Sequence, residues 1–357
     1  MEKILIDGRL LSGKPTGISR YTKEVIHALI AHFGQENICV ITAKKYINVD
    51  HYNILTTSLK PYNPFHYLLF PFFVNRQNFS IYYSTFYSGL WFKTRGRKQI
   101  LTVHDLMYLR IKNYFSPFAI NNAISKIFLN CIVKSSLRSG NLVISVSNTT
   151  KKDLLEYFKT GSNVISEGVN YLEENPAPEV NIFDRFKIRK EKYFLYVGNF
   201  RKQKNIPFLV EAFIQSNSPH HLVLVGNNRF LRHENEKIIF TGVLDDYEIQ
   251  SLYKNCLSFV MPSLYEGFGL PILEAYCAGA RVLSANQGAL AEFHELGVNY
   301  FSPFNLNELV FLLLNSENLP RPTESEIELV RNTYSWQNQT KRIINSIESL
   351  ISLQKIL

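Results

Sequence analysis

The chain has 357 residues, of which 46% are hydrophobic and 19% are charged, so it is long enough for two globular domains and too apolar to be disordered throughout. Its 39 Lys and Arg against 30 Asp and Glu give a net charge of +9, and no apolar run approaches the length of a membrane span. The longest run, 67–74, is expected in the core or in a surface loop. Because Asp7 and Arg9 interrupt the first apolar run, no signal peptide is expected and we predict a cytoplasmic protein.

Strand-like and helix-like runs alternate along the first half, a pattern that predicts a parallel sheet with helices on both faces. Strands are expected at 3–7, 38–42, 80–83, 99–103 and 142–146. Helices are expected at 19–33 and at 148–158, the second with Asn148 as its cap.

The second half repeats this alternation after a polar, proline-bearing segment at 171–182, which predicts an interdomain linker. Strands are expected at 193–197, 221–225, 238–241, 257–261 and 281–285. Helices are expected at 207–215, 245–255, 270–278 and 335–356. We therefore predict an α/β fold with domains at 1–170 and 171–335 and a final helix at 336–357.

The four cysteines are far apart and lie mostly in apolar stretches: Cys39, Cys131, Cys256 and Cys277. Their spacing does not suit metal ligation, so we expect buried free thiols in a reducing compartment.

Residues 263–280, SLYEGFGLPILEAYCAGA, place two carboxylates around a glycine-flanked turn at the start of a predicted helix. Gly267 and Gly269 allow a ligand to approach the backbone closely, and Pro271 suits a first helical turn. The N–H groups at such a helix start attract a phosphate. Glu266 and Glu274 would add little to phosphate affinity, but they suit the hydroxyls of a nucleotide sugar.

This segment resembles the signature of glycosyltransferase family 4, carried here by Glu266-Gly-Phe-Gly-Leu-Pro, Glu274-Ala and Gly279. The resemblance implies a retaining enzyme of GT-B fold: two Rossmann-like domains facing a central cleft, with a C-terminal helix crossing back to the first. It places Glu266 beside the donor sugar and Glu274 on the ribose. It also places the backbone N–H groups of Phe268, Gly269 and Leu270 on the sugar hydroxyls and diphosphate. A surface helix with two solvated glutamates is the structural alternative.

The basic loop after the 193–197 strand contains Arg201, Lys202 and Lys204, which would contact a diphosphate. Lys204 matches the lysine that the family carries here, whereas the place of the usual arginine holds Asn199, for which Arg201 is the candidate substitute. A solvated basic loop is the alternative, chiefly for Lys202.

Four further elements resemble the family more weakly. Gly17 lies in the first strand-to-helix turn, where the backbone would approach phosphate, although an ordinary turn explains it equally. His104 could donate to a sugar hydroxyl, with Asp105 as its orienter or as an acceptor-side base; a core or loop histidine remains equally open. Glu292 is a candidate near the donor base and ribose. Gly168 and Asn170 match a turn that closes the first domain.

Charge is unevenly distributed: residues 1–170 hold 21 Lys and Arg and 9 Asp and Glu, a net +12, whereas residues 171–357 hold 18 and 21, a net −3. The basic segment 93–98 follows the aromatic stretch 86–92, a pairing that suits peripheral docking on anionic lipid. A solvated turn beside a core strand explains it equally, and no motif supports nucleic-acid binding.

We therefore predict a hexosyltransferase that uses a nucleoside diphosphate sugar and a hydroxyl acceptor. The basic first domain suggests a lipid-linked saccharide acceptor in surface-polysaccharide or lipopolysaccharide biosynthesis, at the cytoplasmic face of the inner membrane. No Asp-x-Asp follows an apolar run, so neither a metal nor a cofactor is expected. The alternatives are a GT-B epimerase or phosphorylase, or a non-catalytic scaffold subunit of a glycosyltransferase complex.

Overall fold

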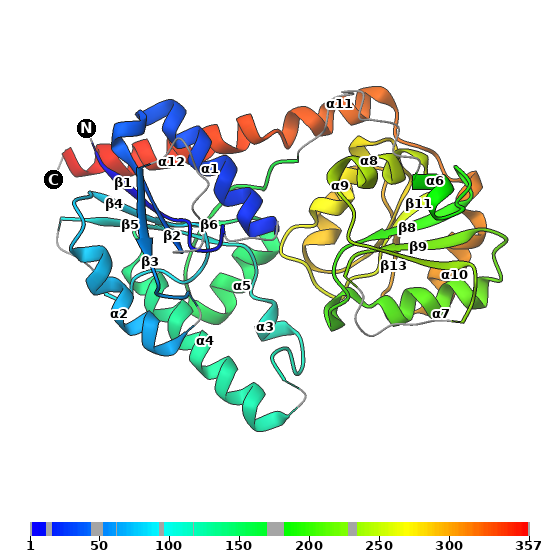
Figure 1. Ribbon diagram of the computed structural model, residues 1–357, viewed down its shortest axis with the longest axis horizontal. Helices are drawn as coiled ribbons and strands as arrows, with labels where there is room; N and C mark the ends of the chain where they lie inside the picture. The colour runs from blue at the N-terminus through cyan, green and yellow to red at the C-terminus, as the bar shows by residue number, and fades with distance from the viewer. Residues whose placement is uncertain are drawn as a thin grey trace. The chain divides into compact units, whose positions relative to one another are not determined.

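The computed structural model describes residues 2–11, 16–43, 53–61, 63–92, 96–116, 118–169, 182–227 and 234–355. The chain forms two compact units (Figure 1). Unit 1 comprises Met1–Gly168 and Trp336–Leu357, and unit 2 comprises Val169–Ser335. The predicted boundaries at 170/171 and 335/336 lie within two residues of this division. The predicted linker at 171–182 falls outside the described residues, except for its last position.

The sheet of unit 1 is parallel throughout, with the order β3-β2-β1-β4-β5-β6-β7. Its strands are β1 (Ile4–Asp7), β2 (Ile38–Ala43), β3 (Asn53–Thr57), β4 (Ile81–Ser84), β5 (Lys98–Val103), β6 (Leu142–Ser145) and β7 (Asn163–Val164). The order reverses between β1 and β4, as in Rossmann-like sheets. The strand β3 was missed because, at the sheet edge, its residues are mostly polar or half-exposed.

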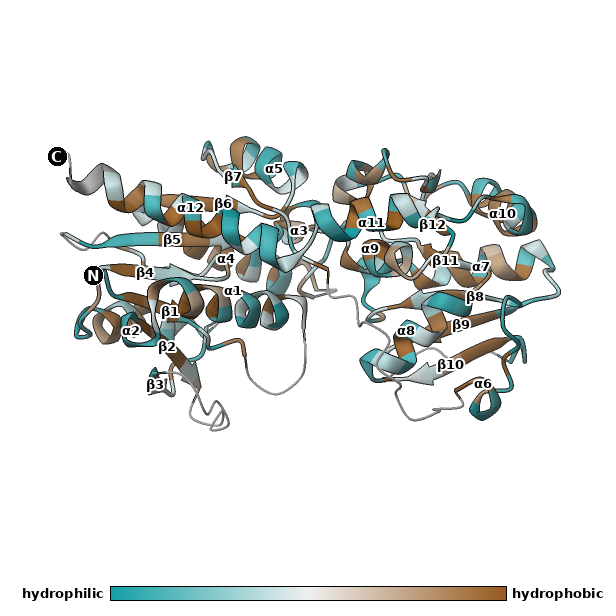
Figure 2. Cartoon of the chain, turned by 90° about the horizontal axis from the view of Figure 1, so that it is seen from above, coloured by the Kyte–Doolittle hydropathy of each residue, from teal (hydrophilic) through white to brown (hydrophobic). Residues whose placement is uncertain are grey.

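Helices cover both faces of this sheet (Figures 1 and 2). One face packs against α1 (Gly17–Phe33) and α12 (Trp336–Lys355), whose buried side chains share a core with the strands. The other face packs against α2 (Pro64–Asn75), α4 (Ala119–Ser139) and α5 (Asn148–Phe158). The short helix α3 (Met107–Arg110) follows β5.

Unit 2 has a six-stranded parallel sheet with the order β10-β9-β8-β11-β12-β13. The strands are β8 (Tyr193–Val197), β9 (His221–Val225), β10 (Ile238–Gly242), β11 (Ser258–Met261), β12 (Val282–Ala285) and β13 (Asn299–Phe301). The helices are α6 (Ile182–Arg185), α7 (Ile206–Ser216), α8 (Asp246–Asn255), α9 (Leu270–Cys277), α10 (Leu306–Asn315) and α11 (Glu324–Thr333). All ten predicted strands are confirmed with ends within one residue, and the six predicted helices with ends within two.

Three local predictions were wrong. The apolar run 67–74 belongs to the helix α2 and is neither wholly core nor a loop. The cap of α5 is Ser147, whose hydroxyl accepts a hydrogen bond from Thr150 N at 3.1 Å, and not Asn148. Cys131 is exposed on α4 and Cys39 is half-buried, whereas Cys256 and Cys277 are buried as expected. Apolar neighbours in sequence did not bury Cys131, because its position on the helix points away from the sheet.

The return of the chain to unit 1 depends on a glycine. Trp336, the first residue of α12, is buried in the core of unit 1, and its ring lies against Gly168. A Cβ atom at Gly168 would lie 2.5 Å from the Trp336 ring and 2.8 Å from the Trp336 Cα, so no larger residue fits without moving the helix. The predicted structural role of Gly168 has this physical basis; Asn170 lies outside the described residues.

We expect Gly168→Ala to lower the free energy of unfolding by about 1–3 kcal/mol, because the added methyl group overpacks the start of α12. The matched control is Gly161→Ala, since a Cβ atom at Gly161 meets nothing within 4 Å. Denaturant unfolding of both variants measures the difference. Equal stability of the two variants would contradict the packing role of Gly168.

Candidate active site

The two loops that carry the main candidate residues follow neighbouring strands of unit 2. The strand order reverses between β8 and β11, and ligands of open α/β sheets bind at the carboxyl edge beside such a reversal. Lys204 ends the short 3₁₀ turn Lys202–Lys204 after β8, and Glu266 lies in the loop after β11. A backbone hydrogen bond of 2.8 Å from Leu264 N to Gln203 O joins the loops.

Lys204 and Glu266 form an ion pair at this edge. Lys204 Nζ donates to Glu266 Oε1 at 2.6 Å, and the two side chains are only 12% and 11% exposed. A charge-assisted hydrogen bond of this length holds both groups in place. Because an ammonium group has three N–H donors, Lys204 can keep this bond and donate to an incoming phosphate as well.

The helix α9 begins directly after this loop with a backbone that glycine permits. Gly269 is the N-cap residue with φ +116°, and Pro271 lies in the first turn. A Cβ atom at Gly269 would lie 2.8 Å from Leu290 Cδ2 and 3.1 Å from Phe293 Cε2. No side chain caps α9, so its first N–H groups are suited to an anion.

The side chain of Phe268 packs inside unit 2. It is buried, with its ring 5.6 Å from Phe293 and 5.9 Å from Tyr334. Only the backbone of Phe268 is therefore available for the ligand contact that the resemblance implies. The neighbouring Gly267 and Leu270 belong to the same turn into α9.

Glu274 lies one turn into α9, and its carboxylate contacts the helix α8. Tyr253 OH donates to Glu274 Oε2 at 3.3 Å. Burial raises the pKa of Tyr253, and Glu274 raises it further. Burial likewise raises the pKa of Tyr196, and Glu266 adds to that shift. Each carboxylate thus lies within electrostatic reach of a buried tyrosine, Glu274 of Tyr253 and Glu266 of Tyr196.

The remaining predicted donor residues lie in exposed or half-buried positions. Arg201 is exposed, just ahead of the Lys204 turn. Glu292 is half-buried in the 3₁₀ turn Gly288–Phe293, and after burial it is the main cause of the raised pKa of Tyr334. Gly17 starts α1 in an exposed position, and a Cβ atom there would meet nothing within 4 Å. None of the described residues therefore requires a glycine at position 17 on steric grounds.

His104 is buried at the carboxyl end of β5, with both ring nitrogens engaged within unit 1. Its Nε2 donates to the carbonyl of Thr85 at 2.9 Å, and its Nδ1 lies 2.6 Å from Glu167 Oε1. The prediction that Asp105 orients this ring was wrong, because the Asp105 carboxylate accepts from Met107 N while Glu167 takes the orienting position. Donation to a sugar hydroxyl would require His104 to give up one of these bonds.

Glu167, the buried partner of His104, is a residue that sequence reasoning missed. It is buried, directly before Gly168, in a stretch interpreted only as a closing turn. Burial alone would lower the pKa of His104, but the hydrogen bond and charge of Glu167 outweigh it and raise that pKa. The Tyr21 ring packs edge-on against His104 at 4.8 Å and lies 5.9 Å from Trp336, which links this pair to the start of α12.

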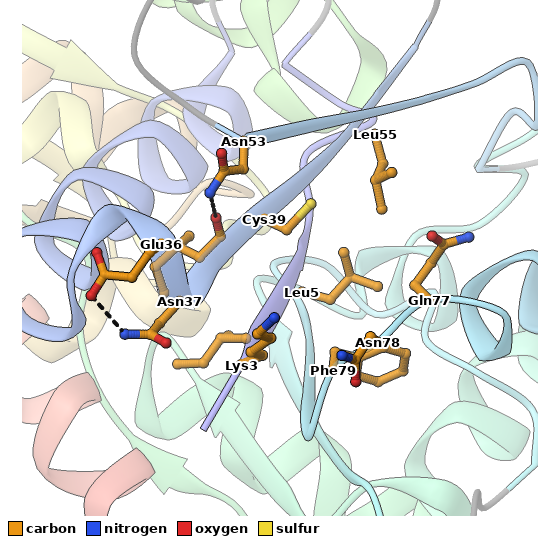
Figure 3. Close-up of a pocket in the computed structure, with 12 residues that line it drawn as sticks. Lys3, Leu5, Glu36, Asn37, Cys39, Asn53, Leu55, Gln77, Asn78 and Phe79 are labelled. Carbon is orange, nitrogen blue, oxygen red and sulfur yellow. Dashed lines mark hydrogen bonds between the residues drawn. The ribbon is translucent and has the colours of Figure 1, made fainter. Parts of the chain in front are cut away.

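A pocket of about 240 Å³ lies at the edge of the unit 1 sheet where the strands begin, opposite the carboxyl edge (Figure 3). Its walls come from the starts of β1, β2 and β3 and include Lys3, Glu36, Cys39, Asn53 and Phe79. Because open parallel sheets bind ligands at their carboxyl edge, we do not assign the donor to this pocket.

The described residues contain no cluster of three or more His, Cys, Asp or Glu side chains placed to hold a metal ion. Their helices include none with both the length and the hydropathy to cross a bilayer.

Comparisons with known proteins agree with the fold, and one of them covers the segment that contains the unit 2 loops. Residues 179–326 match the family model described as glycosyl transferases group 1. The chain is 25% identical over 280 residues to O-antigen chain mannosyltransferase B of Escherichia coli, a match that covers 72% of this chain and 71% of that protein.

Among solved structures, sucrose-phosphate synthase from Thermosynechococcus elongatus superposes with a TM-score of 0.75 at 18% identity, over 99% of this chain and all of that one. Alr3699/HepE of Anabaena, solved with UDP and glucose, superposes with a TM-score of 0.70 at 16% identity, over 98% and 100%. The predicted GT-B fold class is confirmed, and the comparisons support the general statement that the chain is a glycosyltransferase.

We expect the His104–Glu167 pair to make stability depend on pH. Because the folded-state pKa of His104 is raised above its ordinary value of about 6.5, the stabilisation is fully present below that pH and is lost as pH rises through the folded pKa. Glu167→Gln should therefore lower the free energy of unfolding by about 2 kcal/mol near pH 6, and by less at higher pH. Denaturant unfolding across this pH range measures the difference.

The matched control is Glu348→Gln, which removes the exposed partner of His32 on α12. We expect that change to cost less than about 0.5 kcal/mol. A deficit of Glu167→Gln that stays constant with pH would contradict the assignment.

Proposed function

We propose that this protein is a retaining glycosyltransferase that moves a hexose from a nucleoside diphosphate sugar to a hydroxyl acceptor. The observation that carries the proposal is the Lys204–Glu266 ion pair at the β8/β11 reversal, directly before the uncapped start of α9. It lies inside the segment that matches the glycosyl transferases group 1 model. The likeness to Alr3699/HepE, solved with UDP and glucose, favours a nucleoside diphosphate donor.

The proposed chemistry is electrostatic. The diphosphate leaving group gains negative charge as the glycosidic bond breaks, and fixed positive groups stabilise it. Lys204, Arg201 and the N–H groups at the start of α9 supply that charge, so the mechanism we propose needs no metal or cofactor. Glu266 stabilises the positive charge that develops on the sugar, and Glu274 accepts hydrogen bonds from the ribose.

The proposed acceptor is a lipid-linked saccharide in the assembly of a surface polysaccharide at the cytoplasmic face of the inner membrane. The similarity to an O-antigen chain mannosyltransferase supports this setting and makes mannose the first sugar to test. The net charge of +12 on residues 1–170 supports an anionic environment for the acceptor.

We expect Lys204→Ala and Glu274→Ala each to weaken binding of the donor by about tenfold or more, because each removes a charge-assisted contact. The measurement is the thermal shift produced by UDP-, GDP-, ADP- and dTDP-sugars, followed by titration with the one that binds. Lys202→Ala is the matched control, since Lys202 is exposed in the same turn.

Lys204→Ala leaves Glu266 without its cation, so we also test the double variant Lys204→Met/Glu266→Gln, which keeps the site neutral. Wild-type donor affinity in Lys204→Ala, Glu274→Ala and this double variant would overturn the assignment of the donor site.

Product analysis separates the proposed reaction from its rivals. A transferase makes a glycoside only when an acceptor is added, and its product keeps the anomeric configuration of the donor. An epimerase converts the donor without an acceptor, a phosphorylase requires inorganic phosphate, and a scaffold subunit converts nothing. We expect NMR of the product to show an acceptor-dependent glycoside with retained configuration; acceptor-independent conversion of the donor would refute the transferase.

A further inference from the structure

The outer face of α2 is apolar. Phe65, Leu68, Leu69 and Phe72 follow helical spacing and are between 41% and 66% exposed. The opposite side of the helix packs against the sheet through Tyr67, Phe70 and Val74. The helix is therefore firmly seated, and its second apolar face contributes nothing to the core of unit 1.

The first half of α4 has the same property. No residue described between 118 and 128 is buried, and Ile120, Ile124 and Ile127 are between 62% and 76% exposed at helical spacing. Burial begins at Leu129, where the helix reaches the sheet. The apolar first half of α4 thus extends beyond the core of unit 1.

These two helices are neighbours on one face of the unit 1 sheet (Figure 1). Tyr67 OH of α2 lies 2.7 Å from Ser135 Oγ of α4. Phe72 extends the surface toward the exposed Trp91, with their ring centroids 6.3 Å apart. We call the exposed apolar residues of α2 and of the first half of α4, together with Trp91, the apolar patch.

The charge around the apolar patch has one sign. From Lys60 to Arg138 the sequence contains eleven Lys and Arg and a single acidic residue, Asp105. Exposed cations follow the exposed apolar residues at helical spacing. Arg76 lies four residues after Phe72, and Lys134 and Arg138 lie seven and eleven residues after Ile127. Neither α2 nor α4 contains an acidic residue.

We propose that the apolar patch docks on a bilayer that contains anionic lipid, with the exposed apolar side chains among the acyl chains and the cations at the headgroups. Aromatic and aliphatic side chains beside a basic rim suit a membrane interface. A second copy of the chain is a poorer occupant, because a symmetric contact would bring two cationic surfaces together. Nucleic acid would neutralise the cations but leave the isoleucines and leucines exposed.

The inference rests on the proposed function only in the identity of the acceptor, since a docked enzyme would reach a lipid-linked saccharide. Docking itself needs neither donor nor acceptor. The donor titration above and the vesicle assay below can therefore fail independently of one another.

The test is flotation of the full-length protein with vesicles of phosphatidylcholine, with and without phosphatidylglycerol. We expect binding to the anionic vesicles and weaker binding at high salt. Leu68→Asp/Phe72→Asp on α2 and Ile124→Asp/Ile127→Asp on α4 should each weaken binding by about tenfold or more. The matched control is Phe311→Asp, at an exposed phenylalanine on α10 of unit 2, which should bind like wild type.

Both double variants change exposed side chains, and circular dichroism and thermal unfolding check that they remain folded. Absence of wild-type binding to anionic vesicles would overturn the proposal, as would wild-type binding in both double variants. Light scattering provides a separate test: a dimer that Leu68→Asp/Phe72→Asp dissociates, without any vesicle binding, would assign the apolar patch to a second copy instead.

Discussion

The pairing of Lys204 with Glu266 is the interaction on which the proposed chemistry depends. Two loops meet because β8 and β11 are neighbours in space and distant in sequence, and each loop brings one charge. The pair is nearly shielded from water, so each group relies on the other for charge compensation. An arriving diphosphate can take up the remaining donors of the ammonium group without leaving the carboxylate unpaired. In the proposed mechanism, the site is therefore prepared electrostatically before the donor binds.

At the carboxyl edge of the unit 1 sheet, the charged side chains are paired with other groups of unit 1. Asp7 accepts a bidentate hydrogen bond from Arg9 and a third bond from Tyr82, and His104 is engaged by Glu167 and by the Thr85 carbonyl. These groups are buried and already satisfied by protein partners, so they fix the loops of unit 1. The two sheets share a topology. Neither of these unit 1 pairs, however, resembles the Lys204–Glu266 pair that we propose to bind an anion in unit 2.

Sequence reasoning succeeded where one signal was sufficient. Short apolar runs located the central strands, and Pro271 with Gly269 located the start of α9, because these residues restrict the backbone directly. It failed where tertiary context decides. The helix α4 was not predicted: the isoleucines of its first half lie on the exposed side and burial begins only at Leu129, so no single apolar face runs along the helix. The partnership of His104 with Glu167 spans 63 residues, and a single sequence carries no signal of such a contact.

The helix α2 shows how composition can mislead and still be informative. An apolar run that lacks charge predicts burial, yet only one side of α2 reaches the core, because a single helix on a sheet has one inner face. The outer face keeps phenylalanine and leucine exposed to water, where they give the isolated unit no stabilisation. The excess of positive charge was visible in the sequence, whereas the apolar surface beside it was not. Together they define a surface that combines two attractions, and an anionic bilayer is the partner that satisfies both at once.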